Sequence, residues 1–485
     1  MKFNIKEKFN NFLNDSKDYP LLVGFIAGFY PMVFYCSNNY ESINSYQHLL
    51  FFSFLFLLVP TIGTYILYKI FNYFSKLNPY KKHLLFVLLI EIMGILLSQV
   101  YYFTIKKKLL LGLFIILCFL SLKVYKKYKK VLLFIFLLSI IPFFKCIYII
   151  IYKSSTDTTA WMKQSDSIES IKFKKKPNIY FIEPDGYTGE EIMLSLPYNY
   201  KNAMYTWLEN NSFTVYKNTR SNYPITLVSN ASMFSMKHHY FGNNLFGEYE
   251  VENSRRIIVG NNPVISIFKN NNYKTFFITE VSYFQQNWAD QNYDYFNIKN
   301  SEIPFFDKGF TMHKDVSSDF KNCLEINKHD QQPKFYFIQK LIPGHIHFDG
   351  TGKKAERNLY LNHIEEANVW IKEMIDLINS RDSSAIILIA SDHGGFVGLE
   401  SDPQMFVEKD KSLVKSIYSN LIAIKWNDIA HNQYDKKLKT NVNIFRILFS
   451  YLSEDKSLLN NLENDGSYNI NHDNYFSKPV VKVLE

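Results

Sequence analysis

Two hydrophobic runs of the sequence end in side chains that can bind a metal ion. The run PNIYFIEPDGY leads into Asp185, and the run SAIILIASDHGG leads into Asp392 and His393. If both runs are buried strands of one open α/β sheet, these side chains lie beyond the strand ends, where such sheets bind ligands. Two carboxylates and an imidazole suit one divalent cation such as Mn²⁺, Zn²⁺ or Mg²⁺, with Ca²⁺ as a further candidate. The ordinary alternative for each motif is a polar turn.

A catalytic metal needs a nucleophile beside it, and the segment RSNYPITLVSNASMFSM offers four hydroxyl groups after its proline. They belong to Thr226, Ser229, Ser232 and Ser235, and Pro224 precedes an apolar pattern that can open a helix. A hydroxyl at a helix start faces backbone N–H groups that favour an anionic phosphoryl or sulfuryl group. Metal coordination would also lower the pKa of the hydroxyl and make it nucleophilic. A threonine there can equally be a simple helix cap.

A third hydrophobic run, in KFYFIQKLIPGHIHFDGTG, ends near Lys340, His345 and His347. Imidazoles at a strand end could bind substrate oxyanions or protonate a leaving group. Arg220 is the remaining candidate for an anion contact, because its guanidinium suits phosphate. These four residues form the predicted substrate-binding set.

The first 152 residues are apolar and basic. They contain 17 lysines and no arginine against five acidic residues, a balance of +12, so the other 333 residues carry 37 basic and 40 acidic groups. A nucleic-acid-binding protein would carry its positive charge on the folded, water-facing domain, so the sequence argues against that class. Three of the four cysteines lie in apolar segments, which excludes a disulfide framework in the remainder.

Five apolar runs in this region are each near the length needed to cross a membrane, although the fourth is short. They span residues 19–37, 47–71, 83–105, 109–125 and 131–152. Lysines in the N-terminal arm and in alternate loops predict a cytoplasmic N-terminus, which places the residues after the fifth run outside the cytoplasm. Lys106, Lys107 and Lys108 oppose this orientation, because it puts them on the outer face.

The remainder of the chain alternates short β-rich runs with longer amphipathic stretches, which predicts an α/β fold with a mostly parallel sheet covered by helices on both faces. A helix is expected over residues 356–379, between the fourth and fifth strands. The expected domains are a transmembrane helical domain (1–152), a linker (153–176) and a catalytic domain (177–485). The expected strands span residues 179–183, 213–216, 273–279, 334–340, 385–390 and 421–425.

These motifs resemble the alkaline phosphatase-like superfamily, which includes sulfatases, lipoteichoic acid synthases and lipid phosphoethanolamine transferases. The resemblance covers about residues 177–460 and implies that Asp185, Asp392 and His393 bind the metal. The stretch TLVSNASMFS is similar to the transferase segment that begins with the nucleophile, which implies that Thr226 attacks while bound to that metal. Several helices before an external catalytic domain are also similar to the transferases, which implies a multi-pass protein of the bacterial inner membrane with a periplasmic catalytic domain.

Two departures narrow the expectation. The Cys-X-Pro-X-Arg pattern of sulfatases is replaced by Thr226-Leu227-Val228-Ser229-Asn230, which disfavours sulfate ester hydrolysis. Gly186 follows Asp185 where two-metal relatives tend to carry a second Asp, so one metal ion is expected.

The leading hypothesis is therefore a transferase for a phospholipid head-group phosphate, either phosphoethanolamine or phosphoglycerol. It would form a phospho-threonine at Thr226 and pass the group to a surface glycan or lipid, with a lipid-linked donor and acceptor and no nucleic acid. A sulfatase-like or phosphodiesterase hydrolase acting on surface polysaccharide is the alternative, and a non-catalytic membrane scaffold is the third reading.

Overall fold

The computed structural model describes residues 5–40, 43, 45–156, 160–239, 254–286, 290–306, 309–470 and 480–485. The chain divides into two compact units, which are treated separately here. Unit 1 comprises Met1–Asp157 with Pro304–Asp307, and unit 2 comprises Thr158–Ile303 with Lys308–Glu485.

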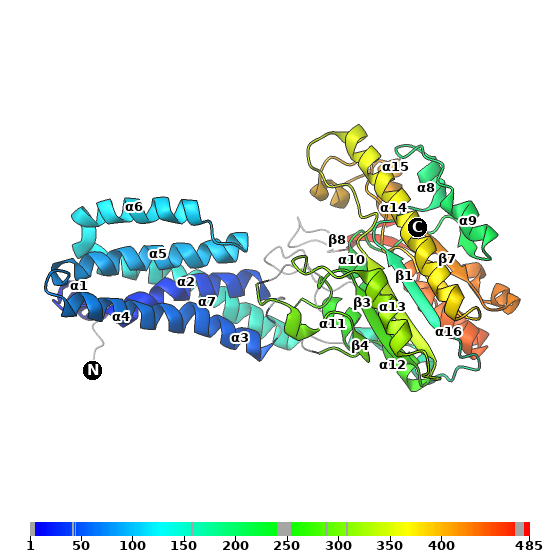
Figure 1. Ribbon diagram of the computed structural model, residues 1–485, viewed down its shortest axis with the longest axis horizontal. Coiled ribbons are helices and arrows are strands. Elements are labelled where there is room, and N and C mark those ends of the chain that lie inside the picture. Colours follow the sequence, from blue (N-terminus) through cyan, green and yellow to red (C-terminus); the bar gives the residue numbers. More distant parts are fainter. Residues whose placement is uncertain are drawn as a thin grey trace. The chain divides into compact units, whose positions relative to one another are not determined.

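Unit 1 is a bundle of apolar helices (Figure 1). Helix α2 lies at its centre and packs against α4, α5 and α7, while α6 packs on α5. The helices of this unit are α1 (Ile5–Asn14), α2 (Pro20–Asn38), α3 (Tyr46–Phe52), a π-helical turn (Ser53–Leu58), α4 (Val59–Tyr73), α5 (Lys81–Tyr102), α6 (Lys107–Val124) and α7 (Tyr128–Thr156).

Four helical stretches are long and apolar enough to cross a membrane, judged by length and composition. They are Pro20–Asn38, Tyr46–Tyr73, Asn78–Tyr102 and the 45-residue stretch Lys107–Ile151. The last one contains both α6 and α7, separated by a short 3-10 turn at Tyr125–Lys127. The five apolar runs of the sequence are therefore five separate helices, which confirms the predicted helical domain of about five spans.

Unit 2 contains a seven-stranded sheet with the order β2-β7-β6-β1-β5-β3-β4. Neighbouring pairs among β6, β1, β5, β3 and β4 are parallel, whereas β7 is antiparallel to both β6 and β2. The predicted mostly parallel sheet is thus confirmed. The strands are β1 (Ile179–Pro184), β2 (Thr214–Tyr216), β3 (Lys274–Thr279), β4 (Tyr295–Phe296), β5 (Lys334–Lys340), β6 (Ile386–Ala390) and β7 (Ile422–Lys425).

Helices cover both faces of this sheet, because the central strands are apolar on both sides. In β1, Ile179 and Phe181 enter the core on one face, and Tyr180 and Ile182 enter the core on the other. The first face carries α10 (Thr226–Ser235), α11 (Ser254–Val259), α12 (Pro263–Asn270) and α16 (Ile444–Ser453). The second carries α8 (Glu190–Leu194), α9 (Met204–Asn210), α13 (Val316–Ile326), α14 (Lys353–Arg381) and α15 (Lys411–Tyr418).

The stretch expected as a linker has structure in both units. Helix α7 continues to Thr156, and Met162, Ile168 and Phe173 are buried in the first core of unit 2. These three apolar side chains are widely spaced among polar residues, so the stretch has no helical or strand period, although it buries apolar surface. A second, two-stranded sheet, β8 (Ser467–Ile470) with β9 (Val480–Leu484), was not expected from the sequence.

Candidate metal centre

The predicted metal ligands meet because their strands are neighbours. Strand β1 pairs in parallel with β6, so both strands end at the same edge of the sheet. Asp185 follows β1 directly, and Asp392 and His393 follow β6, separated from its last residue, Ala390, by Ser391. One potential ligand atom from each of these three residues lies within 4.8 Å of the others, and all three residues are buried. The structure thus brings together the three residues that the two strand-end motifs singled out.

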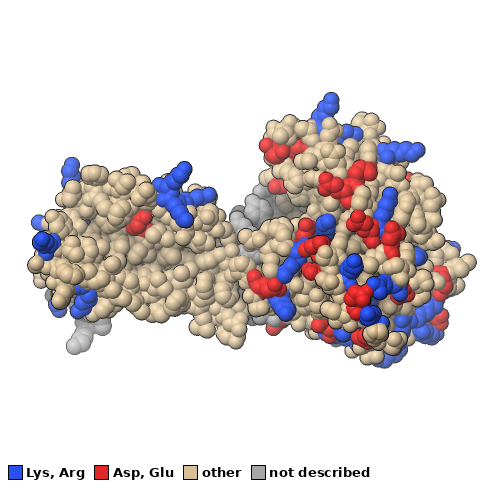
Figure 2. Space-filling model, in the orientation of Figure 1, with Lys and Arg blue, Asp and Glu red and all other residues tan. Residues whose placement is uncertain are grey.

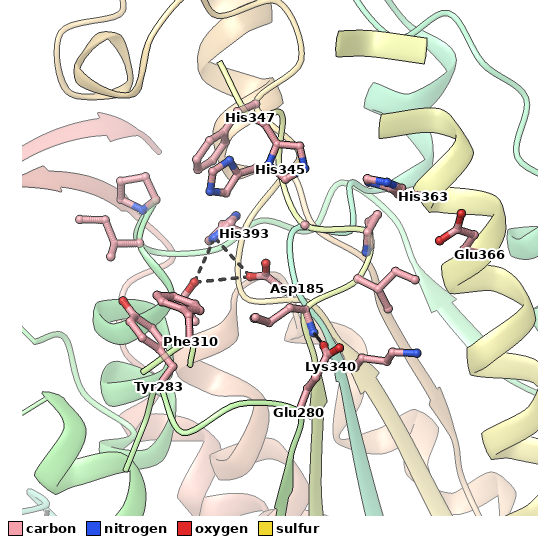
Figure 3. Close-up of a pocket in the computed structure, with 18 of the residues that line it drawn as sticks. Asp185, Glu280, Tyr283, Phe310, Lys340, His345, His347, His363, Glu366 and His393 are labelled. Carbon is pink, nitrogen blue, oxygen red and sulfur yellow. Dashed lines mark hydrogen bonds and ion pairs between the residues drawn. The ribbon is translucent and has the colours of Figure 1, made fainter. Parts of the chain in front are cut away.

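Thr226 is the hydroxyl that reaches this cluster. Its Oγ1 lies 3.2 Å from His393 Nε2 and 3.5 Å from Asp185 Oδ1 (Figure 3). It is the first residue of α10, and the preceding Ile225 contributes no side-chain cap. The N–H groups at this helix start are therefore not capped by the side chain of Ile225 and can face an anionic group held beside Thr226.

The other hydroxyls of α10 donate hydrogen bonds to backbone carbonyl oxygens. Ser229 Oγ donates to the backbone carbonyl of Asp392 at 2.7 Å, which ties α10 to the loop after β6. Ser232 and Ser235 donate to carbonyl oxygens of their own helix. Of these four candidate hydroxyls, that of Thr226 therefore lies beside the Asp185 and His393 side chains.

Three acidic side chains lie buried at the site, and two of them, Asp185 and Asp392, lie within ion-pair distance of His393. Glu183, Asp185 and Asp392 are all buried, and none of them forms an ion pair with Lys or Arg among the residues that the structure describes. Burial and the neighbouring Asp392 hold the pKa of Asp185 well above its ordinary value. Burial opposes ionisation of Asp392 as well, but His393 and a hydrogen bond from the Gly186 N–H lower its pKa overall.

Backbone contacts fix which nitrogen of His393 faces the cluster. Its Nδ1 lies 2.8 Å from the carbonyl oxygen of Gly394, so Nδ1 must carry the proton. In the neutral ring, Nε2 is then unprotonated and lies 3.3 Å from Asp392 Oδ2. A ring nitrogen held in this way by a carbonyl is the usual arrangement of a metal-binding histidine.

A divalent cation fits this donor set. Asp392 Oδ2 is buried and accepts no hydrogen bond from the described residues, although a buried charged oxygen is costly unless it is paired. A bound cation would pair with this oxygen and offset the negative charge of the carboxylates. Two carboxylate oxygens and an imidazole nitrogen suit Mn²⁺ or Zn²⁺, and the carboxylates also suit Mg²⁺.

The cluster opens into a cavity of about 620 Å³. The wall opposite Thr226 comes from the loop after β5 and from one face of α14, and carries His345, His347, His363 and Glu366 (Figure 3). His345 stacks on Phe396, and its Nδ1 lies 2.6 Å from the carbonyl oxygen of Ile346, so its Nε2 is free when the ring is neutral. Burial and the nearby His393 lower the pKa of His345, which favours that neutral form.

A third part of the cavity is acidic and aromatic. Glu280 follows strand β3, and its Oε2 accepts the N–H of Leu341 at 2.9 Å. Tyr283 and Phe310 also line the cavity, with their rings stacked at 4.9 Å. The sequence reasoning missed these residues as well as His363 and Glu366. The strand-end rule could have found Glu280, because it occupies the position after β3 that Asp185 occupies one residue beyond β1.

The predicted substrate contacts occupy different positions in the structure. Lys340 borders the cavity, but its side chain points away from Asp185 and its Nζ lies 5.6 Å from the ring centroid of Trp370 (Figure 3). Arg220 does not line the cavity, because its backbone bridges Ser419 and Thr440 and its Nη2 donates to the carbonyl of Asp465 at 2.8 Å. His345 and His347 do line it.

Comparison with known proteins gives structural neighbours only. No protein-family model and no curated protein matches the chain. The C-terminal periplasmic domain of EptC from Escherichia coli is 13% identical, with coverage of 64% of this chain and 93% of that one and a TM-score of 0.42. The membrane-integral lipooligosaccharide phosphoethanolamine transferase A (EptA) from Neisseria meningitidis is 10% identical, with coverage of 89% and 95% and a TM-score of 0.41.

The C-terminal periplasmic domain of the phosphoethanolamine transferase EptC from Campylobacter jejuni is 14% identical, with coverage of 57% and 90% and a TM-score of 0.36. These neighbours belong to one of the groups that the sequence motifs resemble. At such low identities and TM-scores, the chemistry of the site rests on the residues of this chain.

Proposed function

We propose that this chain is a metal-dependent transferase that moves the head-group phosphate of a membrane phospholipid through a phospho-threonine at Thr226. The observation that carries the proposal is the position of the Thr226 hydroxyl at the N-terminus of α10. Its Oγ1 lies 3.2 Å from His393 Nε2 and 3.5 Å from Asp185 Oδ1. A hydroxyl, a metal-type donor set and a helix N-terminus are the parts that phosphoryl transfer requires.

In this proposal Asp185, Asp392 and His393 hold one divalent ion, with Thr226 beside it. When bound, the ion lowers the pKa of the Thr226 hydroxyl and offsets negative charge on the phosphoryl group. The N–H groups at the start of α10 bind the phosphoryl oxygens from the other side. Ser229 keeps the helix in place through its bond to the Asp392 carbonyl.

The first step forms a bond between Thr226 Oγ1 and phosphorus and breaks the bond between phosphorus and the diacylglycerol oxygen. The proton lost by Thr226 ends on that oxygen, and His345 carries it through its free Nε2. In the second step, the oxygen of an acceptor hydroxyl bonds to the phosphorus and the bond between phosphorus and Thr226 Oγ1 breaks. The proton of the acceptor hydroxyl passes to Thr226 Oγ1, which restores the threonine. The acceptor is a lipid-linked glycan or a lipid; water in its place would make the enzyme a phosphodiesterase.

The charge of the cavity wall favours an amine-bearing head group over glycerol. Glu280 and Glu366 line the cavity, and neither carboxylate forms an ion pair with Lys or Arg within the described ranges. An ammonium group can pair with such a carboxylate, and it can also interact with the faces of Tyr283 and Phe310. Phosphoethanolamine is therefore the preferred group in this proposal.

Membrane anchoring fits lipid substrates. Unit 1 exposes many large apolar side chains on helices long enough to span a bilayer, which is the expected surface of a membrane domain. Lysine placement puts the N-terminus in the cytoplasm and unit 2 on the periplasmic side of a bacterial inner membrane.

The test is covalent labelling of the full-length protein in detergent. Incubation with head-group-labelled phosphatidylethanolamine or phosphatidylglycerol, followed by peptide mass spectrometry, should find the label on Thr226. Thr226→Ala should abolish it, whereas Ser232→Ala is the matched control, since that hydroxyl bonds only within α10 among the described contacts.

The transferase, hydrolase and scaffold hypotheses predict different results. Label that persists in water until a glycan or lipid acceptor is added supports transfer, and label lost in water alone supports hydrolysis. Turnover that survives Thr226→Ala would overturn the mechanism. Protein that binds no metal on titration and takes up no label would be a scaffold.

A further inference from the structure

The lysines at the two ends of the helical bundle in unit 1 differ in whether acidic residues lie beside them. At the end with the N-terminal arm, acidic residues accompany the lysines. Lys129 Nζ lies 2.5 Å from Asp15 Oδ1, and Lys81 and Lys82 lie 3.9 and 3.8 Å from carboxylate oxygens of Asp18. These contacts neutralise part of the positive charge within the protein.

At the opposite end, the turn between α5 and α6 places Lys106, Lys107 and Lys108 side by side. All three are exposed, and no ion pair with an acidic residue involves them in the part of the chain that the structure describes. In Figure 2, the lysines on the visible face of this unit gather toward its ends, and the surface between them is largely uncharged. The three lysines therefore form a local positive patch.

This patch is held by a defined turn. Ser98 is buried in α5, and its Oγ accepts the N–H of Lys106 at 2.9 Å and donates to the carbonyl of Thr104 at 3.0 Å. Phe103 closes α5 in the left-handed conformation, with φ of 53°. The backbone beneath the lysines is thus fixed before any ligand arrives.

The surface around the lysines is hollow and amphipathic. A depression of about 550 Å³ is lined by the three lysines together with Tyr102, Ile105 and Leu109. The last three are exposed, and Lys106 Nζ lies 5.0 Å from the centre of the Tyr102 ring. Cations beside exposed tyrosine and aliphatic groups match the depth of lipid head groups, where apolar stems meet water.

Three energetic costs coincide at this turn. Lysines at this end oppose the usual membrane orientation, in which positive loops stay in the cytoplasm. They also lie at the N-terminus of the 18-residue helix α6, where the helix dipole disfavours cations, and they repel one another. A bound anion would relieve all three costs.

We propose that Lys106, Lys107 and Lys108, with Tyr102, Ile105 and Leu109, bind the anionic head group of a phospholipid in the leaflet at this end of the bundle. The lysines bind the phosphate, and the apolar side chains contact the upper part of the acyl chains. The site is distinct from the Thr226 cavity, and its existence does not depend on the chemistry proposed there.

Native mass spectrometry of the full-length protein in detergent tests this site. Protein is mixed with phosphatidylglycerol or with phosphatidylcholine, and retained lipid is counted. The test variant carries Lys106→Gln, Lys107→Gln and Lys108→Gln. The matched control carries Lys123→Gln, Lys126→Gln and Lys127→Gln, which removes the same charge from the other end of α6 and leaves the pairs of Asp15 and Asp18 intact.

The expected result is a loss of phosphatidylglycerol retention of about tenfold or more in the test variant, since each lysine near an anionic lipid contributes about fivefold. Phosphatidylglycerol retention by the control variant and phosphatidylcholine retention by all variants should be unchanged. Salt at 0.5 M, where the Debye length is about 4 Å, should weaken phosphatidylglycerol binding. Equal retention in the two triple variants, or equal loss, would overturn the proposal, because the lysines would then act only as a topology signal or as bulk charge.

A charge-preserving variant guards against misfolding. Replacing the same three lysines with arginine keeps the positive patch, so phosphatidylglycerol should still be retained. Loss of binding in that variant, with an unchanged melting temperature, would also contradict the proposal.

Discussion

The two walls of the Thr226 cavity differ in how firmly their side chains are held. On the wall from β1, β6 and α10, Asp185, Asp392 and His393 are buried and lie within 4.8 Å of one another. On the wall from the β5 loop and α14, His347 and Glu366 are exposed, and the His347 and His363 rings lie 6.1 Å apart. The first wall is organised before substrate binds, as a reaction centre needs, and the second is open enough to select among substrates.

The largest loss of turnover is expected for a substitution in the buried wall. Asp392→Asn should lower turnover by about 10³-fold or more, because it removes a charged metal-ligand oxygen from the reaction centre. Metal content measured by mass spectrometry should fall in parallel. Asp402→Asn, at an exposed carboxylate outside the cluster, should keep both metal and turnover. Equal losses in the two variants would mean that the buried wall has no special role.

Substitutions of His345 and His347 test which of these histidines carries the proton. His345→Gln should reduce kcat by about 10²-fold, since a positioned proton carrier contributes at least that much, while phosphorylated Thr226 should form more slowly in single-turnover experiments. His347→Gln, at the exposed mouth, should alter KM more than kcat. The reverse pattern would transfer the proton-carrying role to His347.

A smaller effect is expected at the acidic part of the cavity. Glu280→Gln should lower the preference for phosphatidylethanolamine over phosphatidylglycerol by about tenfold, equivalent to about 1.4 kcal/mol. The amide can still accept the Leu341 N–H, so the fold should be preserved. Competition between the two labelled lipids measures the ratio, and an unchanged ratio would place head-group recognition elsewhere.

The smallest effect concerns the stability of the metal-free protein. Burial and Asp392 raise the pKa of Asp185 above 3.8, so its contribution to stability is greatest when it is protonated and declines as the pH rises from about 4 through the raised pKa. At pH 8 without metal, Asp185→Asn should therefore melt a few degrees above the wild type. The difference should shrink toward pH 4; a constant difference measured by scanning fluorimetry would exclude Asp185 as its source.

The buried wall could be predicted from the sequence because each of its parts has a local signal. Strands β1 and β6 are continuous apolar runs, and the residues after them must lie at one sheet edge if the strands are parallel. Thr226 needed the added resemblance, since spacing alone could not separate it from Ser229. The structure separates them through the bond of Ser229 to the Asp392 carbonyl.

The open wall was harder to predict because it depends on tertiary placement. His363 and Glu366 lie on one face of α14, where they read as ordinary polar residues of an amphipathic helix until the β5 loop is placed opposite. The antiparallel direction of β7 has no signature in its short run of four residues. Arg220 lies outside the cavity because chain proximity to Thr226 does not fix the direction of a side chain: its backbone bridges Ser419 and Thr440, and its guanidinium donates to the Asp465 carbonyl.

Gly186 and Gly344 join the two walls. A Cβ on Gly186, which has a φ of +67°, would lie 2.4 Å from the carbonyl oxygen of Gly344, so the two loops meet backbone to backbone. The Gly344 N–H also donates to the Asp185 carbonyl at 2.9 Å. For protein engineering, this contact defines a fixed frame: substitutions on the face of α14 can test the proposed head-group selectivity, whereas lengthening or tilting the β5 loop at Gly344 would disturb Asp185, the proposed metal ligand.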